Sequence, residues 1–292
     1  MAISKIGVVG CGLMGHGISQ ICAQAGWDVV VREIDQDQLD KGMGKIEKQL
    51  DRAVEKGKMD QSEADAVRGR ITPTLDYADL ADSDLVIEAI TEDLDRKLEM
   101  WGELDGIVKE DAYLATNTSS LPVVTQADST NRPERMIGLH FFNPPQVMPL
   151  LEVVRAEGTS LEATTLGFAI GEKLGKTTVA AGDNRGFIVN RLLVPYMLDA
   201  IRAHEQGVGS IEDIDTAMKA GASHPMGPLT LADFVGLDTL ASIADVMQEA
   251  YGEDRFAAPS SLSKLVEAGH YGRKTGRGFY DYSGERPVPS EL

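Results

Sequence analysis

Residues 5–17 read KIGVVGCGLMGHG, and this stretch decides the fold of the first part of the chain. The β-branched run at its start predicts a buried strand that ends at glycines. Apolar and small residues then recur at helical spacing from Leu13 to Ala25, and Gly26 ends the predicted helix. A second apolar run, WDVVVR at 27–32, predicts another strand. Strand, helix and strand together predict a βαβ unit with parallel strands and a right-handed crossover.

Gly10, Gly12 and Gly15 form the pattern G-x-G-x-x-G between the first strand and the first helix. Such glycines allow a tight turn, close approach of the backbone to a pyrophosphate, and close packing of helix on strand. Glu33 ends the second strand, eighteen residues after Gly15, where an acid accepts hydrogen bonds from ribose hydroxyls. The segment predicts a dinucleotide site that prefers NAD to NADP. The alternatives are a purely structural glycine loop and a solvated charge at Glu33.

Further apolar runs alternate with helical patterns through the first two thirds of the chain. This alternation favours an open, mainly parallel, doubly wound sheet, with the late strands as candidates for antiparallel pairing. A polar stretch at 35–70 reads as an exposed amphipathic helix or helical hairpin. The further strands are expected at 84–89, 112–115, 135–139, 150–154 and 177–181.

The character of the chain changes at the polar pentapeptide GDNRG, residues 182–186. Strand signals nearly vanish beyond it, and helical spacing continues almost to the end. We therefore predict an α/β protein with a Rossmann-like, doubly wound N-terminal domain over residues 1–184. A smaller all-α C-terminal domain is expected over residues 185–292.

Composition excludes several classes of protein. The 292 residues include 28 Lys and Arg against 46 Asp and Glu, a formal net charge of −18, which argues against nucleic acid or an anionic membrane as a partner. Two cysteines, Cys11 and Cys22, cannot build a disulfide framework or a zinc knuckle, and no metal site is predicted. The first residues lack a signal-peptide pattern, and no apolar run reaches 18 residues, so a cytoplasmic location is expected.

His140 and Glu152 are the candidate chemical pair. His140 ends a predicted strand just before the turn FFNPP, at the edge where open α/β sheets bind ligands. Glu152 interrupts the apolar run MPLLEVV, and a buried carboxylate needs a partner able to carry charge. A carboxylate would fix the imidazole tautomer and leave the other ring nitrogen free to take a proton from an alcohol. A hydrogen-bonded core histidine and an outward-facing glutamate are the alternatives.

Other polar segments have two interpretations each. The run NTSS at 117–120 can cap a helix that begins near Pro122 or supply hydroxyls for a substrate oxygen, and both can be true. Asn190, in an apolar helical run, is either a satisfied core amide or a contribution to the cleft. The basic, glycine-rich stretch 272–278 is either a solvated turn or one wall of an anion site.

The segments GCGLMGHGI, GLHFFNPPQVMPLLEVV, GFIVNRLLVPY and GRKTGRGFYDY resemble the 3-hydroxyacyl-CoA dehydrogenase family, and most closely its stand-alone members that act on 3-hydroxybutyryl-CoA. The resemblance implies that His140 is a general base oriented by Glu152, while Ser119 and Asn190 bind the substrate oxygen or hold the pair. It implies that Lys56 contacts a phosphate of the CoA substrate. It implies NAD contacts from Gly10, Gly12, Leu13, Met14, Gly15, Glu33, Glu92, Lys97, Asn117, Asn143 and Lys274. It also implies a role in fatty acid metabolism and a homodimer formed through the helical domain.

The sequence departs from the family's usual pattern at two positions. Glu33 stands where Asp is more common, which lengthens the reach to the ribose, and Thr116 stands where Ser is usual. The rival interpretations are an L-gulonate-type dehydrogenase, which acts on a sugar acid without CoA, and an NAD-binding protein without catalysis.

Overall fold

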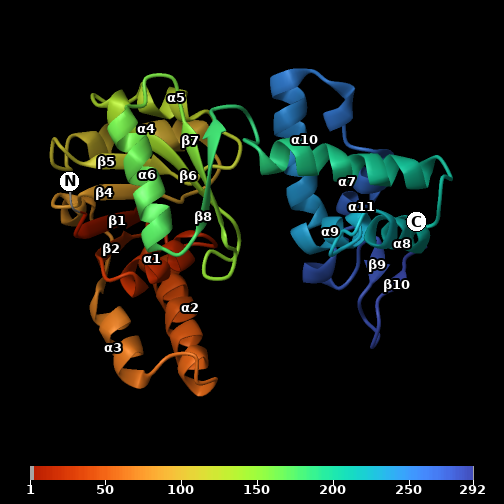
Figure 1. Cartoon of the computed structure of the whole chain (residues 1–292), viewed down its shortest axis with the longest axis horizontal. Coiled ribbons are helices and arrows are strands. Elements are labelled where there is room, and N and C mark those ends of the chain that lie inside the picture. Colours follow the sequence, from red (N-terminus) through yellow and green to blue (C-terminus); the bar gives the residue numbers. More distant parts are fainter. Residues whose placement is uncertain (1–2, 292) are drawn as a thin grey trace. The chain divides into compact units, whose positions relative to one another are not determined.

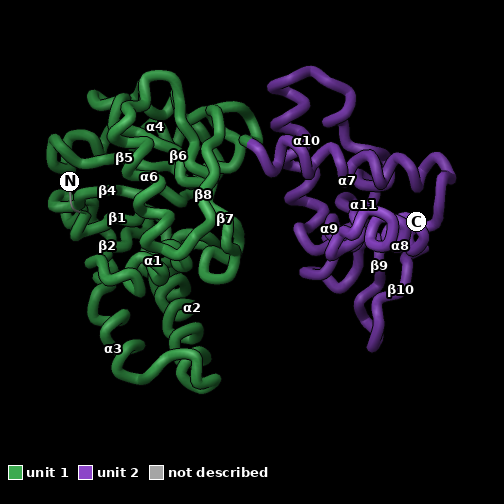
Figure 2. Tube along the Cα trace, viewed as in Figure 1, with its two compact units in different colours: residues 1–187 green, residues 188–292 purple. Residues whose placement is uncertain are grey.

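The computed structural model describes residues 3–291. The chain consists of two compact units, residues 1–187 and 188–292 (Figure 2). The division follows residue 187, whereas the sequence analysis placed the boundary after residue 184. Each unit has its own apolar core, and each is described here by itself.

Unit 1 contains an eight-stranded sheet with the strand order β3-β2-β1-β4-β5-β6-β7-β8 (Figure 1). The strands are β1 (Lys5–Val9), β2 (Asp28–Arg32), β3 (Ile71–Thr74), β4 (Leu85–Glu88), β5 (Tyr113–Thr116), β6 (Met136–Phe141), β7 (Leu150–Arg155) and β8 (Thr177–Gly182). The first six run parallel, β7 pairs antiparallel with β6, and β8 runs parallel to β7. The predicted doubly wound sheet with reversed late strands is confirmed.

Helices cover both faces of this sheet. The unit 1 helices are α1 (Gly15–Gln24), α2 (Gln36–Glu55), α3 (Gln61–Gly69), α4 (Leu94–Asp105), α5 (Val123–Ala127) and α6 (Leu161–Lys173), with short 3-10 turns η1 (Tyr77–Leu80) and η2 (Pro133–Arg135). One core cluster joins α1, α2, α3 and α6 to one sheet face, and a second joins α4, α5 and η1 to the other. The stretch 35–70 is thus a helical hairpin, one of the two predicted forms.

Strand β3 is missing from the sequence prediction. Its sequence, ITPT, is short and contains Pro73, which argues against a central strand. The strand lies at the edge of the sheet, where one side of the backbone needs no strand partner, so the proline is tolerated.

Unit 2 is built from helices, as predicted, apart from one small strand pair. The helices are α7 (Val189–Glu205), α8 (Ile211–Gly221), α9 (Pro228–Val235), α10 (Leu237–Tyr251) and α11 (Ser260–Glu267), with 3-10 turns η3 (Asp254–Phe256) and η4 (Arg273–Thr275). The two-residue strands β9 (Tyr280–Asp281) and β10 (Val288–Pro289) pair antiparallel, a detail that the sequence prediction does not include. Such short pairs leave no alternation in the sequence from which to predict them.

Candidate active site

The glycine loop after β1 has the geometry that the motif requires. Gly10 has φ +96° and lies against the backbone of Ala89, so it needs the conformational freedom of glycine. A Cβ on Gly15 would lie 1.8 Å from the Gly10 carbonyl oxygen, which rules out any larger residue there. A Cβ on Gly12 would meet nothing within 4 Å. The open space at Gly12 fits the close approach of a cofactor pyrophosphate.

Glu33 belongs to the same loop. Its Oε2 accepts a hydrogen bond from the backbone N–H of Cys11 at 2.7 Å, so it is not a free, solvated charge. Burial and the Glu33 carboxylate together raise the pKa of the Cys11 thiol to about 12. Arg32 faces away, because its guanidinium lies 3.9 Å from the centre of the Tyr77 ring and donates to the Leu75 carbonyl. Of Arg32 and Glu33 at the end of β2, it is therefore the Glu33 carboxylate that lies at the glycine loop.

His140 and Glu152 meet across the antiparallel pair β6 and β7. The register places them directly opposite each other, and cross-strand neighbours of this kind project to the same face of a sheet. Nδ1 of His140 lies 2.6 Å from Oε2 of Glu152. The histidine is 5% exposed and the glutamate is fully buried. Since a carboxylate oxygen accepts, Nδ1 is the donor of this contact, and in the neutral ring Nε2 is then the acceptor nitrogen.

Two aromatic rings flank this imidazole. The centroids of Phe142 and Phe187 lie 4.5 Å and 5.4 Å from that of His140. Phe187 has φ +47°, a left-handed conformation that is uncommon for a bulky residue and that tertiary packing must hold in place. The rings restrict the imidazole to the orientation that Glu152 selects. Phe187 was not among the predicted site residues, because sequence spacing gives no sign of a left-handed aromatic.

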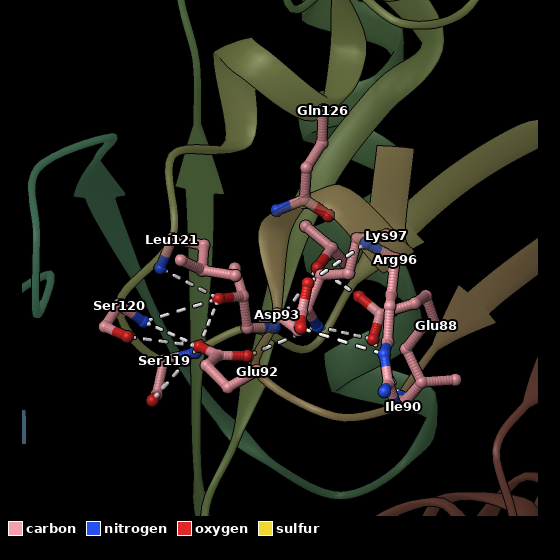
Figure 3. Close-up of polar contacts among 12 residues, drawn as sticks. Glu88, Ile90, Glu92, Asp93, Arg96, Lys97, Ser119, Ser120, Leu121 and Gln126 are labelled. Carbon is pink, nitrogen blue, oxygen red and sulfur yellow. Dashed lines mark hydrogen bonds and ion pairs between the residues drawn. The ribbon is translucent and has the colours of Figure 1, made fainter. Parts of the chain in front are cut away.

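A buried network of charged side chains lies at the carboxyl end of β4 (Figure 3). The ammonium of Lys97, on α4, is 2.5 Å from Glu88 and 3.2 Å from Glu92. Lys97 is 1% exposed and Glu88 is fully buried. Glu88 also accepts from the Thr116 hydroxyl at 2.6 Å and from the Ile90 N–H at 2.8 Å. Lys97 is thus a buried partner of two carboxylates.

Glu92 holds the loop that follows β5. Its Oε1 accepts from the N–H of Ser119 at 2.8 Å, from the N–H of Ser120 at 3.1 Å, and from the Thr118 hydroxyl (Figure 3). Burial alone would raise the pKa of Glu92, but the Lys97 ammonium and these hydrogen bonds outweigh it and lower the pKa. The carboxylate therefore stays ionised and fixes the backbone beside Ser119.

Of the two interpretations of NTSS, the helix cap is not what the structure shows. Helix α5 begins at Val123, and the amides of Val123 and Val124 donate to the two oxygens of Asp183 at 2.9 and 2.7 Å. The hydroxyl of Thr118 accepts from the Leu121 N–H within its own turn. Asp183 comes from the end of β8, sixty residues away, and no local signal could have identified it.

The two predicted asparagines of unit 1 lie near the end of β6. Oδ1 of Asn117 accepts from the Phe141 N–H at 3.0 Å and so ties the end of β5 to β6. Asn143 is exposed, and its peptide bond to Pro144 is cis. Asn117 follows β5 and Asn143 follows β6. The carboxyl ends of these parallel strands lie at the same edge of the sheet as the glycine loop after β1.

The remaining predicted residues lie on other elements. Asn190 is half-buried in the first turn of α7. Lys274, on η4, pairs with Asp238 at the start of α10. Lys56 is exposed where α2 ends. Leu13 is exposed, and Met14 is the residue before α1.

A cavity of about 640 Å³ lies at the opposite edge of the sheet, before β5 and β6. It is lined by polar residues, Glu110, Asp111, Asn131, Arg132, Glu134 and Arg135. Arg132 donates to Asp105 at 2.7 Å, and Arg135 donates to the Asp111 carbonyl at 2.7 Å. Because these contacts occupy the arginines, the cavity is a weaker candidate than the carboxyl edge. Within residues 3–291 no helix is long and apolar enough to cross a bilayer, and no cluster of metal-binding side chains is present.

The chain matches known proteins over nearly its whole length. Residues 5–184 match the model of the 3-hydroxyacyl-CoA dehydrogenase NAD binding domain, and residues 186–282 match that of the 3-hydroxyacyl-CoA dehydrogenase C-terminal domain. The chain belongs to the 3-hydroxyacyl-CoA dehydrogenase family. The predicted family, the enzyme class and the cofactor NAD are thereby confirmed.

Several known proteins of this family are highly similar to the chain in sequence and in structure. The chain is 49% identical over 284 residues to a 3-hydroxybutyryl-CoA dehydrogenase of Mycobacterium tuberculosis, covering 96% of this chain and 99% of the relative. The crystal structure of M. tuberculosis FadB2 is 48% identical, with a TM-score of 0.93 over 97% of this chain and 100% of that one. The structure of (S)-3-hydroxybutyryl-CoA dehydrogenase from Ralstonia eutropha is 39% identical, with a TM-score of 0.92 over the same shares.

Proposed function

We propose that this dehydrogenase interconverts (S)-3-hydroxybutyryl-CoA and acetoacetyl-CoA with NAD. The observation that carries the proposal is the 2.6 Å contact between His140 Nδ1 and Glu152 Oε2 on two buried, register-paired strands. The names of the relatives support the substrate, because several are 3-hydroxybutyryl-CoA dehydrogenases.

In this proposal His140 Nε2 removes the proton of the substrate 3-hydroxyl. Glu152 keeps the other ring nitrogen protonated before the reaction and stabilises the imidazolium that forms. NAD, when bound, supplies the acceptor for the hydride that leaves C3. In the reverse direction the imidazolium returns its proton to the oxygen of the 3-oxo group. Positioned acid–base catalysis of this kind contributes roughly 10²- to 10⁴-fold to the rate.

The assignment of binding residues follows the resemblance to the family. Gly10, Gly12, Leu13, Met14, Gly15 and Glu33 form one end of the proposed NAD site. Glu92, Asn117 and Asn143 are assigned to its ribose and nicotinamide end, and Lys97 acts there through Glu92, because it is itself buried. Ser119 and Asn190 are assigned to the substrate oxygen, Lys56 to a CoA phosphate, and Lys274 to the cofactor.

NADH absorbance with a series of substrates tests the proposal. Acetoacetyl-CoA is expected to be reduced faster than 3-oxoacyl-CoA esters of up to C16, and NADH to be used in preference to NADPH. Turnover of a free sugar acid without CoA turnover would instead support the L-gulonate-type activity. Binding of NADH without turnover of any substrate would support a non-catalytic protein.

The proposal extends to assembly and cellular role. We propose a homodimer formed through unit 2 and a cytoplasmic role in fatty acid β-oxidation. Light scattering after size exclusion tests the first part, with twice the chain mass of 31.5 kDa as the expected result. A monomer at micromolar concentration would contradict it.

A further inference from the structure

His16 is a second buried histidine of unit 1, and the proton transfer by His140 does not involve it. It is the second residue of α1, directly after the third glycine of the loop, and only 6% of it is exposed. Its Nδ1 lies 2.6 Å from the Gly12 carbonyl oxygen, and its Nε2 lies 3.2 Å from the side-chain nitrogen of Gln49 on α2. A carbonyl oxygen only accepts, so Nδ1 carries the proton and Nε2 accepts from Gln49. Burial lowers the pKa of His16, which favours this neutral form.

This bond fixes the orientation of one peptide group. In a trans peptide the C=O and the following N–H point in opposite directions. When the Gly12 carbonyl is directed at the buried imidazole, the N–H of Leu13 is directed the other way. That direction leads outward, because Gly12 is exposed with open space beside its Cα, and Leu13 is 63% exposed.

Gly12 cannot hold this orientation by itself. Without a Cβ its φ and ψ are weakly restricted, and even an added Cβ would meet no atom within 4 Å, so no steric contact on that side of the residue fixes the backbone. Gly10 and Gly15, in contrast, are held by close backbone contacts. The peptide after Gly12 is therefore the part of the loop that needs a side-chain anchor.

We propose that His16 is a positioning residue for NAD, which holds the Gly12–Leu13 peptide so that the Leu13 N–H faces the cofactor pyrophosphate. The proposal rests on NAD binding by this domain and is independent of the catalytic role of His140. The imidazole takes part in no proton transfer here. Its contribution is preorganisation, since a peptide already oriented loses no further freedom when the anion binds.

Ligands with and without phosphate test the proposal. The variant His16→Leu introduces an apolar side chain of similar size and removes the donor. We expect it to bind NADH and ADP about three- to tenfold more weakly, the range of one net hydrogen bond, and to bind adenosine as the wild type does. The KM for NADH should rise by the same factor, with the loss falling on KM rather than on kcat. Unchanged affinity for ADP, or an equal loss for adenosine, would overturn the proposal.

Two further variants separate the anchor from general effects. His16→Asn retains an N–H donor and should recover most of the lost ADP affinity. His204→Leu is the matched control, because His204 makes the same kind of contact, from Nδ1 to the Gly209 carbonyl at 3.2 Å, within unit 2. It should leave ADP affinity unchanged. Failure of His16→Asn to recover any affinity would argue against the anchor.

The wild-type protein offers a test that does not depend on a variant folding. Nitrogen-15 NMR of the His16 ring should show a protonated Nδ1 and a bare Nε2. The Leu13 amide signal should shift when ADP is added but not when adenosine is added. The opposite tautomer, or a Leu13 amide indifferent to ADP, would overturn the proposal. A wild type that binds no NADH would instead refute the proposed function.

Discussion

The contact His140–Glu152 joins two strands of the sheet, and the contact Lys97–Glu88 joins a helix to a strand of the same sheet. The two contacts have nearly the same length, 2.6 and 2.5 Å, yet they suit different tasks. Both join buried groups. An imidazole has two ring nitrogens and can serve as base and then as acid, whereas the ammonium of Lys97 lies between two carboxylates as their charge partner. The first pair can therefore transfer a proton, and the second can only hold its surroundings in place.

The neighbours of the two pairs show the same difference. Around Lys97, the oxygens of Glu88 and Glu92 accept from hydroxyls and backbone amides (Figure 3). Around His140 the neighbours of the ring are the aromatic side chains Phe142 and Phe187. A saturated polar network fixes a loop, while an apolar surround strengthens the effect of one carboxylate on one imidazole. Variants of each pair should therefore fail in different measurements.

The largest expected effect is that of His140→Gln on turnover. Loss of the general base should reduce kcat for acetoacetyl-CoA about 10²- to 10⁴-fold. NADH affinity, measured by fluorescence on the same preparation, should stay within about twofold of the wild type, since the glycine loop is unchanged. Full turnover in this variant would remove His140 from the mechanism.

Lys97→Met should act on stability. Removing the ammonium leaves Glu88 buried without its cation, a change that costs about 3–5 kcal/mol of unfolding free energy. The control is Arg96→Met on the same helix, because Arg96 pairs with Asp93 and their side chains are 68% and 50% exposed, and such pairs contribute about 1 kcal/mol or less. Urea unfolding measures both. Equal losses in the two variants would contradict the structural role of the buried pair.

Glu152→Gln should reduce turnover less than His140→Gln does. The amide oxygen can still accept from Nδ1, so the tautomer is retained, but the negative charge that stabilises the imidazolium is lost. A decrease in kcat of about ten- to hundredfold is expected, the lower part of the range for positioned acid–base catalysis, because the base itself is retained. Circular dichroism should show an unchanged fold. A variant that is fully active would show that the charge of Glu152 is not used.

The smallest effect is the pH dependence of Glu92→Gln. Because the folded protein lowers the pKa of Glu92, its contribution to stability is present above the ordinary carboxyl pKa and is lost as the pH falls through the lowered value. The wild type should therefore be more stable than the variant near pH 7, and the difference should shrink below about pH 4. Glu267→Gln, at an exposed helix end, is the control. A difference that stays constant from pH 7 to pH 3 would contradict the assignment.

The parts of the molecule that the sequence predicts are those set by local spacing. The glycine loop follows from three glycines between a strand and a helix. The contact between His140 and Glu152 is predictable because each is a polar residue in an otherwise apolar strand, and the two strands are adjacent. Glu88 is likewise an acid at the end of a buried apolar strand, LVIE. A buried carboxylate needs a cationic partner, and this rule predicts a residue such as Lys97 beside it.

Other parts depend on contacts that sequence spacing does not encode. Asp183 caps α5 from sixty residues away, and NTSS resembles a cap so closely that the local signal is misleading. Glu92 and Lys97 were assigned to the cofactor by resemblance, yet their contacts show that they also hold each other and the Ser119 loop. Tertiary contacts override the local preference in each case.

A double-mutant cycle on kcat for acetoacetyl-CoA reduction tests the central claim most directly. If His140 and Glu152 act as one acid–base unit, the variant carrying both His140→Gln and Glu152→Gln should be no slower than His140→Gln alone, because Glu152 has no imidazolium left to stabilise. If the two losses instead multiply, the residues act separately, and the account of the site is wrong.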